Sequence, residues 1–415
     1  MLEINTKEEQ KVILNLNSVN ISNDLGPAIC ITNAKKTIIV LNGENIIEDG
    51  EEYNIDAKAT LFSNDTLKIK GEGSLEVIGN YKHAIASDDD IIIESGNIIL
   101  SAIKDGMHAN DGIQIDGGNI TVKTAHDGIE SEGILIINNG TFDFSCEDDG
   151  ITAQGDFTIN GGTYSITKCE EGIESKSKLV INDGLIEVEA NDDGLNATDI
   201  EINGGKIYCN SKNGDAIDSN GTVTITGGII VAVGGNVPEG GLDFDNNVCT
   251  ITGGTIIAAG GVNSVPTESK CTQSVILLGN LESNSVIRIQ DESGNEIITF
   301  KLEKTYQSLL ISNQKLEKNK KYIVYSNGEV TEGETFHGLY TEKTTYSNGE
   351  ENTSFTLESN VTNLSGSTTF GGGVFNPQNG NKGPMGGMKE PNEEFNPNGE
   401  NAPGLSGTKP NSNNL

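Results

Sequence analysis

The sequence predicts an all-β fold, a parallel β-helix with about 22 residues in each turn. Three observations predict it. An acidic residue followed by glycine recurs every 22 residues, apolar and polar residues alternate between these dipeptides, and a second glycine recurs half a period later. A fixed period of this size with short alternating strands is typical of a solenoid. Helical repeats are excluded because apolar residues recur at a spacing of 2, and leucine-rich repeats because their Leu and Asn consensus is absent.

The repeat is clearest in the middle of the chain. Its acidic-glycine dipeptides are Asp105-Gly106, Asp127-Gly128, Asp149-Gly150, Glu171-Gly172 and Asp193-Gly194. The frame extends back to His83 and forward to Asp215, and it resumes at Gly240 after three extra residues. The half-period glycines, such as Gly118 in IQIDGGNITV, lie between two alternating strands. We therefore expect successive turns to stack at the ~4.8 Å spacing of paired strands, with Ile, Val, Leu and Phe side chains filling the interior.

The chain divides into four parts by composition and periodicity. Residues 67–261 carry the regular β-helix, and residues 1–66 are expected to form an N-terminal cap and the first irregular turns, because the open edge of a solenoid needs cover. Residues 262–363 still alternate but lose the period, which predicts a C-terminal β extension that acts as a cap or forms a small β domain. Residues 364–415 are rich in Gly, Asn, Pro and Ser, cannot bury a core and are expected to be a flexible tail.

The composition excludes several classes of partner. The formal net charge is −34, from 61 acidic and 27 basic residues, so the surface repels nucleic acid and anionic lipid and favours metal cations. No apolar run is long enough to predict a membrane span. The first residues, MLEINTKEEQ, lack the basic and apolar regions of a signal peptide, so the chain is either cytosolic or a form whose leader is missing. The six cysteines contain no CxxC pair, which argues against a cysteine zinc site.

Stacking would turn the repeat into three ladders of side chains along one edge. The central ladder contains His83, Asp105, Asp127, Asp149, Glu171, Asp193 and Asp215. The residues just before these form a flanking ladder of Lys82, Lys104, His126, Asp148, Glu170, Asp192 and Gly214. Three residues after the central ladder lies a third ladder of Ala86, His108, Glu130, Thr152, Glu174, Asn196, Asp218 and, beyond the insertion, Asp243.

The acidic ladders predict calcium binding. Two carboxylates about 4.8 Å apart repel by roughly 3.5 kcal/mol at an effective dielectric near 20, and a hard cation bound between them would offset this. Calcium accepts six to eight oxygen ligands in flexible geometry, so it suits carboxylates on adjacent turns. The candidate ligands are Asp127, Glu130, Asp148, Asp149, Glu170, Glu171, Glu174, Asp192, Asp193, Asp215, Asp218 and Asp243. The fullest set is Asp149 with Glu170, Glu171 and Glu174.

A purely structural interpretation of the repeat also exists. Asp-Gly is a common turn pair, since Asp caps its own backbone and Gly accepts a positive φ, so the repeat could mark only a repeated corner with a solvated acidic edge. The third ladder favours calcium, because Glu130, Glu174 and Asp218 are not turn residues and yet lie beside the corner.

Two segments resemble a known family. GNYKHAIASDDDIIIESGNIILSA (79–102), followed by the 22-residue repeats, and KTYQSLLISNQKLEKNKKYIVY (304–325) resemble the clostridial carbohydrate-binding β-helix family, which is similar in fold to calcium-dependent pectate lyases. The resemblance covers roughly residues 10–350. It implies a right-handed β-helix, calcium along the acidic ladder, and binding of cellulose and acidic plant polysaccharides at or outside the cell wall. The fullest set of acids reproduces the calcium pattern of these lyases, with Glu in place of Asp at three positions.

The choice between an enzyme and a binding protein depends on a base. A lyase that removes the C5 proton of a uronate needs a Lys or Arg close to the metal. The one arginine, Arg288, lies outside the repeat, and Lys104, Lys176 and Lys178 are the lysines nearest the ladders. An acid ladder that recurs on every turn is more typical of multivalent cation binding, and the absence of Trp argues against a flat platform for neutral glucans.

The sequence therefore predicts a non-catalytic, calcium-dependent protein that binds plant cell-wall polysaccharides, acidic pectin-like ones first and cellulose second. A calcium-dependent polysaccharide lyase and a structural cell-surface β-helix remain the alternatives. We expect a monomer with no nucleic-acid partner, placed outside the cell or on its surface as the resemblance implies.

Overall fold

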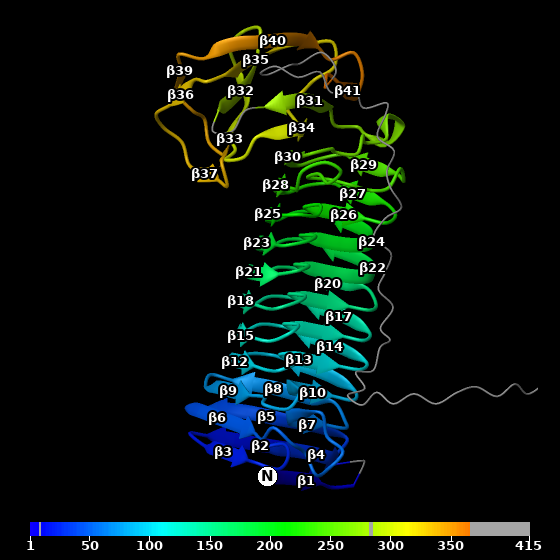
Figure 1. Cartoon of the computed structure of the whole chain (residues 1–415), viewed down its shortest axis with the longest axis vertical. Coiled ribbons are helices and arrows are strands. Elements are labelled where there is room, and N and C mark those ends of the chain that lie inside the picture. The colour runs from blue at the N-terminus through cyan, green and yellow to red at the C-terminus, as the bar shows by residue number, and fades with distance from the viewer. Residues whose placement is uncertain (8–9, 282–284, 366–415) are drawn as a thin grey trace, which may run out of the picture. The chain divides into compact units, whose positions relative to one another are not determined.

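The structure is a computed structural model that describes residues 1–7, 10–281 and 285–365, and all of these lie in one compact unit. It confirms the predicted parallel β-solenoid, with turns of about 22 residues stacked one on another (Figure 1). Most of the predicted tail, residues 366–415, lies outside the described residues. The described segments include one 3-10 helix, Glu268–Lys270, and none of them forms a helix long and apolar enough to cross a membrane.

Each regular turn contains three strands, so the solenoid has three faces. The first two faces belong to one sheet of 19 strands within the described residues. The first face contains β1 (Leu2–Asn5), β4 (Ile29–Asn33), β7 (Ala59–Ser63), β10 (His83–Ser87), β13 (Met107–Ala109), β16 (Ile129–Ser131), β19 (Ile151–Ala153), β22 (Ile173–Ile181), β24 (Leu195–Ile202) and β26 (Ile217–Ser219). The second contains β2 (Lys11–Asn17), β5 (Lys36–Asn42), β8 (Leu67–Gly71), β11 (Asp90–Ile93), β14 (Gly112–Ile115), β17 (Ile134–Ile137), β20 (Phe157–Ile159), β27 (Val223–Ile225) and β29 (Cys249–Ile251), while β22 and β24 run through both faces.

The third face is a separate sheet of 14 strands within the described residues. Its solenoid strands are β3 (Asn20–Asn23), β6 (Glu44–Asp49), β9 (Ser74–Ile78), β12 (Asn97–Ser101), β15 (Asn119–Thr124), β18 (Thr141–Ser145), β21 (Thr163–Cys169), β23 (Leu185–Ala190), β25 (Lys206–Ser211), β28 (Ile229–Val233) and β30 (Thr255–Gly260). Pairing between these neighbouring turns is parallel, so equivalent residues of each turn stack in register.

The interior of the solenoid is a stack of fully buried apolar side chains. On the second face the series runs through Ile91, Ile113, Leu135, Phe157, Leu179, Ile200 and Val223. Phe142 and Tyr164 stack in the same way on the third face, with ring centroids 4.6 Å apart. Each such side chain contributes roughly 1.5–3 kcal/mol by leaving water, so the core holds the register that aligns the edges of the turns.

A glycine with positive φ opens the third strand of each regular turn. The series is Gly96, Gly118, Gly140, Gly162, Gly184, Gly205, Gly228 and Gly254, with φ between 87° and 141°. Only glycine adopts this conformation without a steric penalty, which explains the half-period glycine of the sequence.

Beside this corner a ladder of side-chain amides runs along the solenoid. The Nδ2 of Asn160 donates to the Oδ1 of Asn138 at 2.8 Å, and Asn182 and Asn203 continue the series with the same direction of donation. The ladder ends on the carboxylate of Asp116, which accepts from Asn138.

The chain leaves the solenoid after β30 and builds antiparallel structure on its end. β34 (Tyr306–Ser312) pairs antiparallel with both β30 and β31 (Val275–Leu281), and β41 (Val361–Asn363) pairs with β31. A sheet of six described strands follows, in the order β37 (Thr335–Phe336), β38 (Leu339–Tyr340), β33 (Glu296–Lys301), β32 (Val286–Asp291), β35 (Lys321–Ser326) and β40 (Glu350–Thr356). β36 (Glu329–Val330) pairs with β39 (Tyr346–Ser347).

This C-terminal sheet has its own apolar core and is fastened to the solenoid. Ile257 of β30 packs into that core, whereas the preceding Ile256 faces the solenoid interior, so β30 is buried on both sides. Between β37 and β38, the ring of His337 stacks on Tyr208 of β25 with centroids 3.6 Å apart, and its Nε2 lies 2.8 Å from Glu187 Oε1.

Candidate functional site

The stacked turns bring the predicted ladders onto one edge of the solenoid. In the third ladder, parallel pairing sets Glu174 opposite Thr152 on one side and Asn196 on the other. The series continues to Asp218, which pairs with Asp243 across the insertion. The predicted register of this ladder is therefore confirmed, including its passage over the three extra residues.

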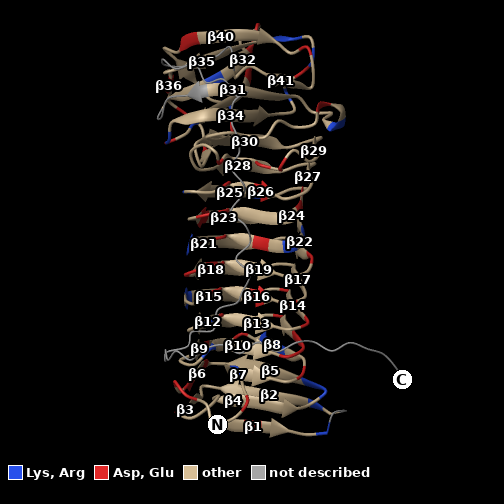
Figure 2. Cartoon of the chain, turned by 45° about the vertical axis from the view of Figure 1, so that its right-hand side comes forward, with Lys and Arg blue, Asp and Glu red and all other residues tan. Residues whose placement is uncertain are grey.

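Backbone hydrogen bonds fix the central ladder. The amide of Gly128 donates to the carbonyl oxygen of Asp149 at 2.9 Å, and the amide of Gly150 donates to Glu171 at the same distance. Because every turn repeats this bond, the acidic side chains emerge at equivalent places, and Figure 2 shows acidic residues recurring from turn to turn along the solenoid.

One acidic group is the middle acid cluster, which we define as Asp149, Glu171 and Glu174. Ligand oxygens of the three carboxylates lie within 4.8 Å of one another. Glu174 is 3% exposed. The Oε2 atoms of Glu171 and Glu174 are buried and have no hydrogen-bond partner among the described residues. Buried carboxylate oxygens without partners are costly, so the cluster lacks something that its own chain does not supply.

The pKa values of two carboxyl groups in the cluster are raised, as expected where buried carboxylates lack partners. Burial, followed by the charge of Glu174, raises the pKa of Asp149 to about 7. Burial and the same neighbour raise the pKa of Glu171 to about 9. Two contacts among the described residues lower these pKa values: the Thr152 hydroxyl donates to Asp149 Oδ2 at 2.9 Å, and the charge of Lys176, which contacts Glu174, acts on Glu171. A bound cation would stabilise the ionised forms.

The chemistry of these donors fits calcium. All are carboxylate oxygens, two of them buried without a partner, and they come from adjacent turns. Calcium binds oxygen ligands at distances of about 2.3–2.6 Å and accepts irregular geometry. Asp149, Glu171 and Glu174 are the residues that would hold it.

The flanking ladder lies outside the middle acid cluster. Glu170 is exposed, and its Oε2 accepts a hydrogen bond from Asn191 at 2.8 Å instead of facing Asp149. Asp148 is about half-exposed, with His126 Nδ1 3.7 Å from its Oδ2. Asp192 is exposed as well. The predicted set of four acids is thus brought together by the structure as a set of three.

A second acidic group follows towards the C-terminus. Burial, followed by the charge of Asp218, raises the pKa of Asp193 to about 8. Burial also raises the pKa of Asp215 to about 10, although the Gly240 amide donates to its carboxylate. Asp243 accepts a hydrogen bond from the hydroxyl of Ser264.

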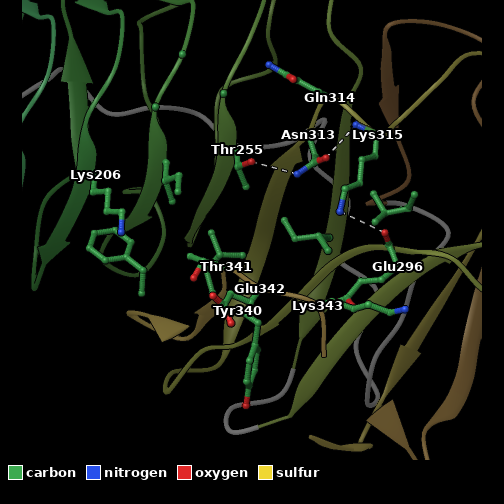
Figure 3. Close-up of a pocket in the computed structure, with 18 of the residues that line it drawn as sticks. Lys206, Thr255, Glu296, Asn313, Gln314, Lys315, Tyr340, Thr341, Glu342 and Lys343 are labelled. Atoms are coloured by element: carbon green, nitrogen blue, oxygen red, sulfur yellow. Dashed lines mark hydrogen bonds between the residues drawn. The ribbon is translucent and has the colours of Figure 1, made fainter. Parts of the chain in front are cut away.

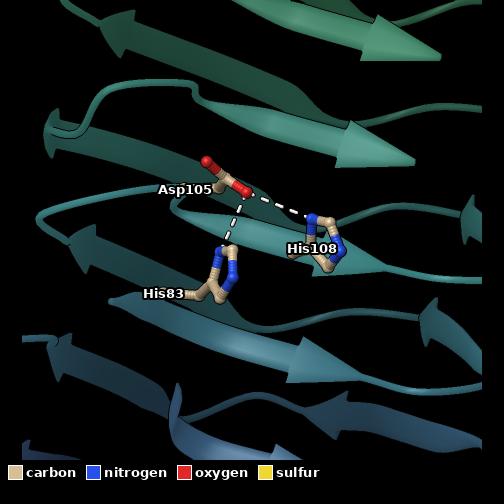
Figure 4. Close-up of side chains that lie close together, drawn as sticks. All are labelled: His83, Asp105 and His108. Atoms are coloured by element: carbon tan, nitrogen blue, oxygen red, sulfur yellow. Dashed lines mark hydrogen bonds and ion pairs between the residues drawn. The ribbon is translucent and has the colours of Figure 1, made fainter. Parts of the chain in front are cut away.

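The first regular turns carry cations at the same edge. We define the first-turn cluster as His83, Lys104, Asp105, His108 and Glu130. Asp105 Oδ2 lies 2.8 Å from His83 Nδ1 and 3.1 Å from His108 Nδ1 (Figure 4). It also lies 3.3 Å from Lys104 Nζ. Glu130 Oε2 lies 3.0 Å from His108 Nδ1 and 3.4 Å from Lys104 Nζ.

These contacts reverse the electrostatics of the middle acid cluster. Burial alone would raise the pKa of Asp105, but the imidazoles of His108 and His83 outweigh it and hold the pKa below its usual range. Burial would lower the pKa of His108, but hydrogen bonds to Asp105 and Glu130 raise it to about 9. Burial lowers the pKa of His83.

Asp127 lies between the two clusters. Its Oδ1 accepts a hydrogen bond from the amide of Asp149 and lies 3.1 Å from His126 Nδ1. Burial raises its pKa to about 6. Asp127 can also join Asp105 and Glu130 in one group of potential metal ligands.

The three candidate lysines occupy different places. Lys176 contacts Glu174 of the middle acid cluster, and Lys104 contacts the first-turn cluster. Lys178 instead pairs with Glu201 at 2.5 Å. Burial would lower the pKa of Lys176, but the hydrogen bond to Glu174 outweighs it and raises the pKa, so Lys176 is a charged donor.

A separate cleft lies between the third face of the solenoid and the C-terminal sheet (Figure 3). Its volume is about 1290 Å³. The corner glycines Gly205 and Gly228 form part of its wall, and Lys206, Lys315 and Tyr340 contribute side chains. Sequence reasoning missed this cleft, because it depends on where the non-repetitive C-terminal sheet packs.

Two known proteins are similar to parts of this chain. A solved structure of the polysaccharide lyase-like protein from C. thermocellum, a gadolinium derivative, is 30% identical in sequence with a TM-score of 0.36, over 43% of this chain and 78% of that one. A carbohydrate-binding domain-containing protein of Acetivibrio thermocellus is 33% identical over 103 residues, which are 23% of this chain. The match spans 36% of that relative's length.

A family model described as carbohydrate-binding domain-containing protein matches residues 1–211 and 166–290. The two matches together cover the whole solenoid and the start of the C-terminal strands. The chain belongs to this carbohydrate-binding domain family.

Proposed function

We propose that this chain binds acidic plant cell-wall polysaccharides through calcium ions held along the acidic edge of the solenoid. The observation that carries the proposal is the middle acid cluster, whose buried Glu171 and Glu174 oxygens lack hydrogen-bond partners among the described residues. Membership of a carbohydrate-binding family supplies the ligand class.

Calcium also resolves a problem of charge. The chain has a formal net charge of −34, so a polyuronate approaching its acidic edge would be repelled. A divalent cation held by Asp149, Glu171 and Glu174 would neutralise that edge and leave coordination positions for ligand oxygens, since calcium accepts six to eight. The ligands come from one chain, so we propose a monomer, and a ligand of this class supports a location at or outside a cell surface.

Retention on immobilised polygalacturonate tests the proposal. We expect retention in calcium and release by a chelator, and we expect Glu174→Gln and Asp149→Asn to lose it. Asp143→Asn is the matched control, because Asp143 is exposed on β18 and lies outside the cluster. Circular dichroism verifies folding of each variant. Retention that neither the chelator nor the cluster variants reduce would overturn the proposal, and retention on cellulose in the same series measures a neutral glucan.

A second candidate function is polysaccharide lyase, and Lys176 favours it. Its ammonium contacts Glu174, so a lysine stands directly beside the residues that would hold calcium. A uronate bound there would lie near a group able to exchange a proton once its contact with Glu174 is relieved. Ultraviolet absorbance of the unsaturated product on polygalacturonate decides: a calcium-dependent signal lost in Lys176→Ala establishes a lyase, and no signal with intact retention establishes a binding protein.

A further inference from the structure

The geometry points to a second kind of metal site in the first-turn cluster. We propose that His83, Asp105 and His108 bind a divalent transition metal of the zinc class, with Glu130 as an adjacent carboxylate. This site is independent of the proposed calcium site, because its donors are different residues of different chemistry.

The three donors come together from two adjacent turns, and Glu130 of the next turn contacts His108. His83 begins β10, His108 lies in β13 opposite Ala86 of β10, and Glu130 lies in β16 opposite His108. Asp105 precedes β13 and reaches the space between the two imidazoles, as Figure 4 shows. The imidazoles themselves stack with centroids 4.6 Å apart, so both present Nδ1 to the same carboxylate.

The distances match a metal's coordination shell. A zinc ion with bonds of about 2.0 Å separates its ligand atoms by roughly 2.9 Å in octahedral and roughly 3.3 Å in tetrahedral geometry. Asp105 Oδ2 lies 2.8 Å from His83 Nδ1 and 3.1 Å from His108 Nδ1. Glu130 Oε2 lies 3.0 Å from His108 Nδ1. The two separations from Asp105 Oδ2 are those of donors that share one centre, and Glu130 is an adjacent carboxylate that contacts His108.

One polar atom in this cluster has an unmet bonding requirement. His83 Nδ1 is buried and lies 2.8 Å from Asp105 Oδ2, yet it makes no hydrogen bond of acceptable alignment with any described residue. The Oδ1 atom of the fully buried Asp105 also has no partner within the described part of the chain, but it points away from the imidazoles (Figure 4). His83 Nδ1 is therefore the atom whose bonding a metal would complete.

The donor set selects the metal. Imidazole nitrogens with carboxylates suit zinc, cobalt and nickel, whereas calcium prefers oxygen donors alone. The charges also favour a divalent cation, because Asp105 and the adjacent Glu130 together carry −2. Lys104 contacts both carboxylates, but its side chain is 48% exposed and can swing into solvent when a metal enters. His83 and His108 are 5% and 10% exposed, so the ion would sit in a nearly dry place.

Cobalt binding to full-length protein, freed of transition metals and kept in saturating calcium, tests the proposal. We expect one equivalent of Co²⁺ to give visible d–d absorption that one equivalent of Zn²⁺ removes. His83→Ala and His108→Ala are each expected to lose the signal and to weaken zinc binding at least tenfold. His126→Ala is the matched control, since that imidazole is about half-exposed on the flanking ladder and should leave the signal unchanged.

A second measurement keeps the proposal testable if a buried variant fails to fold. The chain has four histidines, so an imidazole NMR spectrum of the unmutated protein has few signals. Zinc should shift the resonances of His83 and His108 and leave those of His126 and His337 in place. The proposal is overturned if no signal moves at stoichiometric zinc, if His126 or His337 moves instead, or if cobalt absorption persists in a folded double variant of His83 and His108. Saturating calcium throughout keeps this outcome separate from that of the polysaccharide assay.

Discussion

The first-turn cluster and the middle acid cluster occupy equivalent places on the same edge of the solenoid. Their buried carboxyl groups differ in what surrounds them, and their pKa values shift in opposite directions. In the first turns, Asp105 is surrounded by His83, His108 and Lys104, and its pKa stays below the usual range. Two turns later, burial and mutual repulsion raise the pKa of Asp149 to about 7 and that of Glu171 to about 9.

The difference shows that the repeat determines where side chains lie on the edge, but not which charges they carry. Backbone bonds between turns are the same in both regions, for example from Gly106 to Asp127 and from Gly150 to Glu171. The residue at the third-ladder position decides the outcome, His108 in one region and Glu174 in the other. One frame can therefore carry internally balanced turns and turns that need an external cation.

The largest effect is expected from removing the imidazole of His108, which balances the buried acids of the first-turn cluster. In metal-free buffer, His108→Ala removes the imidazole that Asp105 and Glu130 share and leaves Asp105 with His83 and Lys104. We expect a loss of about 3 kcal/mol in the free energy of unfolding, the lower end of the range for breaking a buried ion pair. Urea denaturation measures it. His126→Ala, which removes a half-exposed imidazole beside Asp127, should cost less than about 1 kcal/mol. Equal losses in both variants would show that Asp105 does not depend on His108.

The next effect concerns pH in the middle acid cluster. The pKa values of Asp149 and Glu171 are raised from 3.8 and 4.5 to about 7 and about 9. A raised carboxyl pKa favours the folded state fully below the unfolded pKa, and this contribution is lost as pH rises through the folded value. The metal-free protein should therefore melt at a lower temperature near pH 9 than near pH 5.

Calcium should remove that pH dependence, because it binds the ionised carboxylates and stabilises the folded state more at high pH. Thermal melts with and without chelator measure both effects. A metal-free melting temperature that rises steadily with pH across this window would contradict the uncompensated state of the cluster.

A smaller effect is expected from removing one charge of the middle acid cluster. Asp149→Asn removes one of three close charges, and we expect the chelated protein at about pH 8 to gain roughly 1–3 kcal/mol in unfolding free energy. The same variant should lose most of the stabilisation that calcium gives the unmodified chain. Chemical denaturation in chelator and in calcium measures the two changes. Destabilisation in chelator would mean that the charge of Asp149 is already balanced.

The smallest effect is expected outside both clusters. Lys178 and Glu201 form an exposed pair, with side chains 44% and 32% exposed, so Lys178→Ala should change stability by less than about 0.5 kcal/mol. Calcium-dependent retention should also stay unchanged. Loss of retention in this variant would extend the functional edge onto the second face of the solenoid.

Sequence alone predicts the solenoid well because its information is periodic. A 22-residue spacing determines which residues stack, and a positive φ at Gly118 and its equivalents explains the second glycine. The C-terminal sheet could not be placed in this way. Its pairs, such as β33 with β32 and β32 with β35, join non-repetitive segments whose register depends on side-chain packing.

The candidate site shows the same limit at the level of side chains. The ladders follow from spacing. The sequence also predicts Glu170 beside Asp149, but in the structure its side chain accepts a hydrogen bond from Asn191 instead. Neighbouring residues in extended chain point to opposite sides, so adjacency in sequence does not imply a shared site. His83 and His108 are 25 residues apart, one period plus the three-residue offset between ladders, and that spacing is the signal that would have found their contact.

The asparagine ladder beside the corner is a chain of identical hydrogen bonds, one for each turn that it spans. Each amide both donates and accepts, so a link such as Asn160 can be followed by another identical link. The ends differ: Asp116 can only accept when ionised, and the Thr226 hydroxyl donates at the far end to Asn203. A duplicated turn that carries Asn would lengthen the chain of bonds without disturbing either end group. Insertion of a whole turn is therefore compatible with the ladder between two of its asparagines. Insertion beyond Asp116 or Thr226 would not extend the ladder.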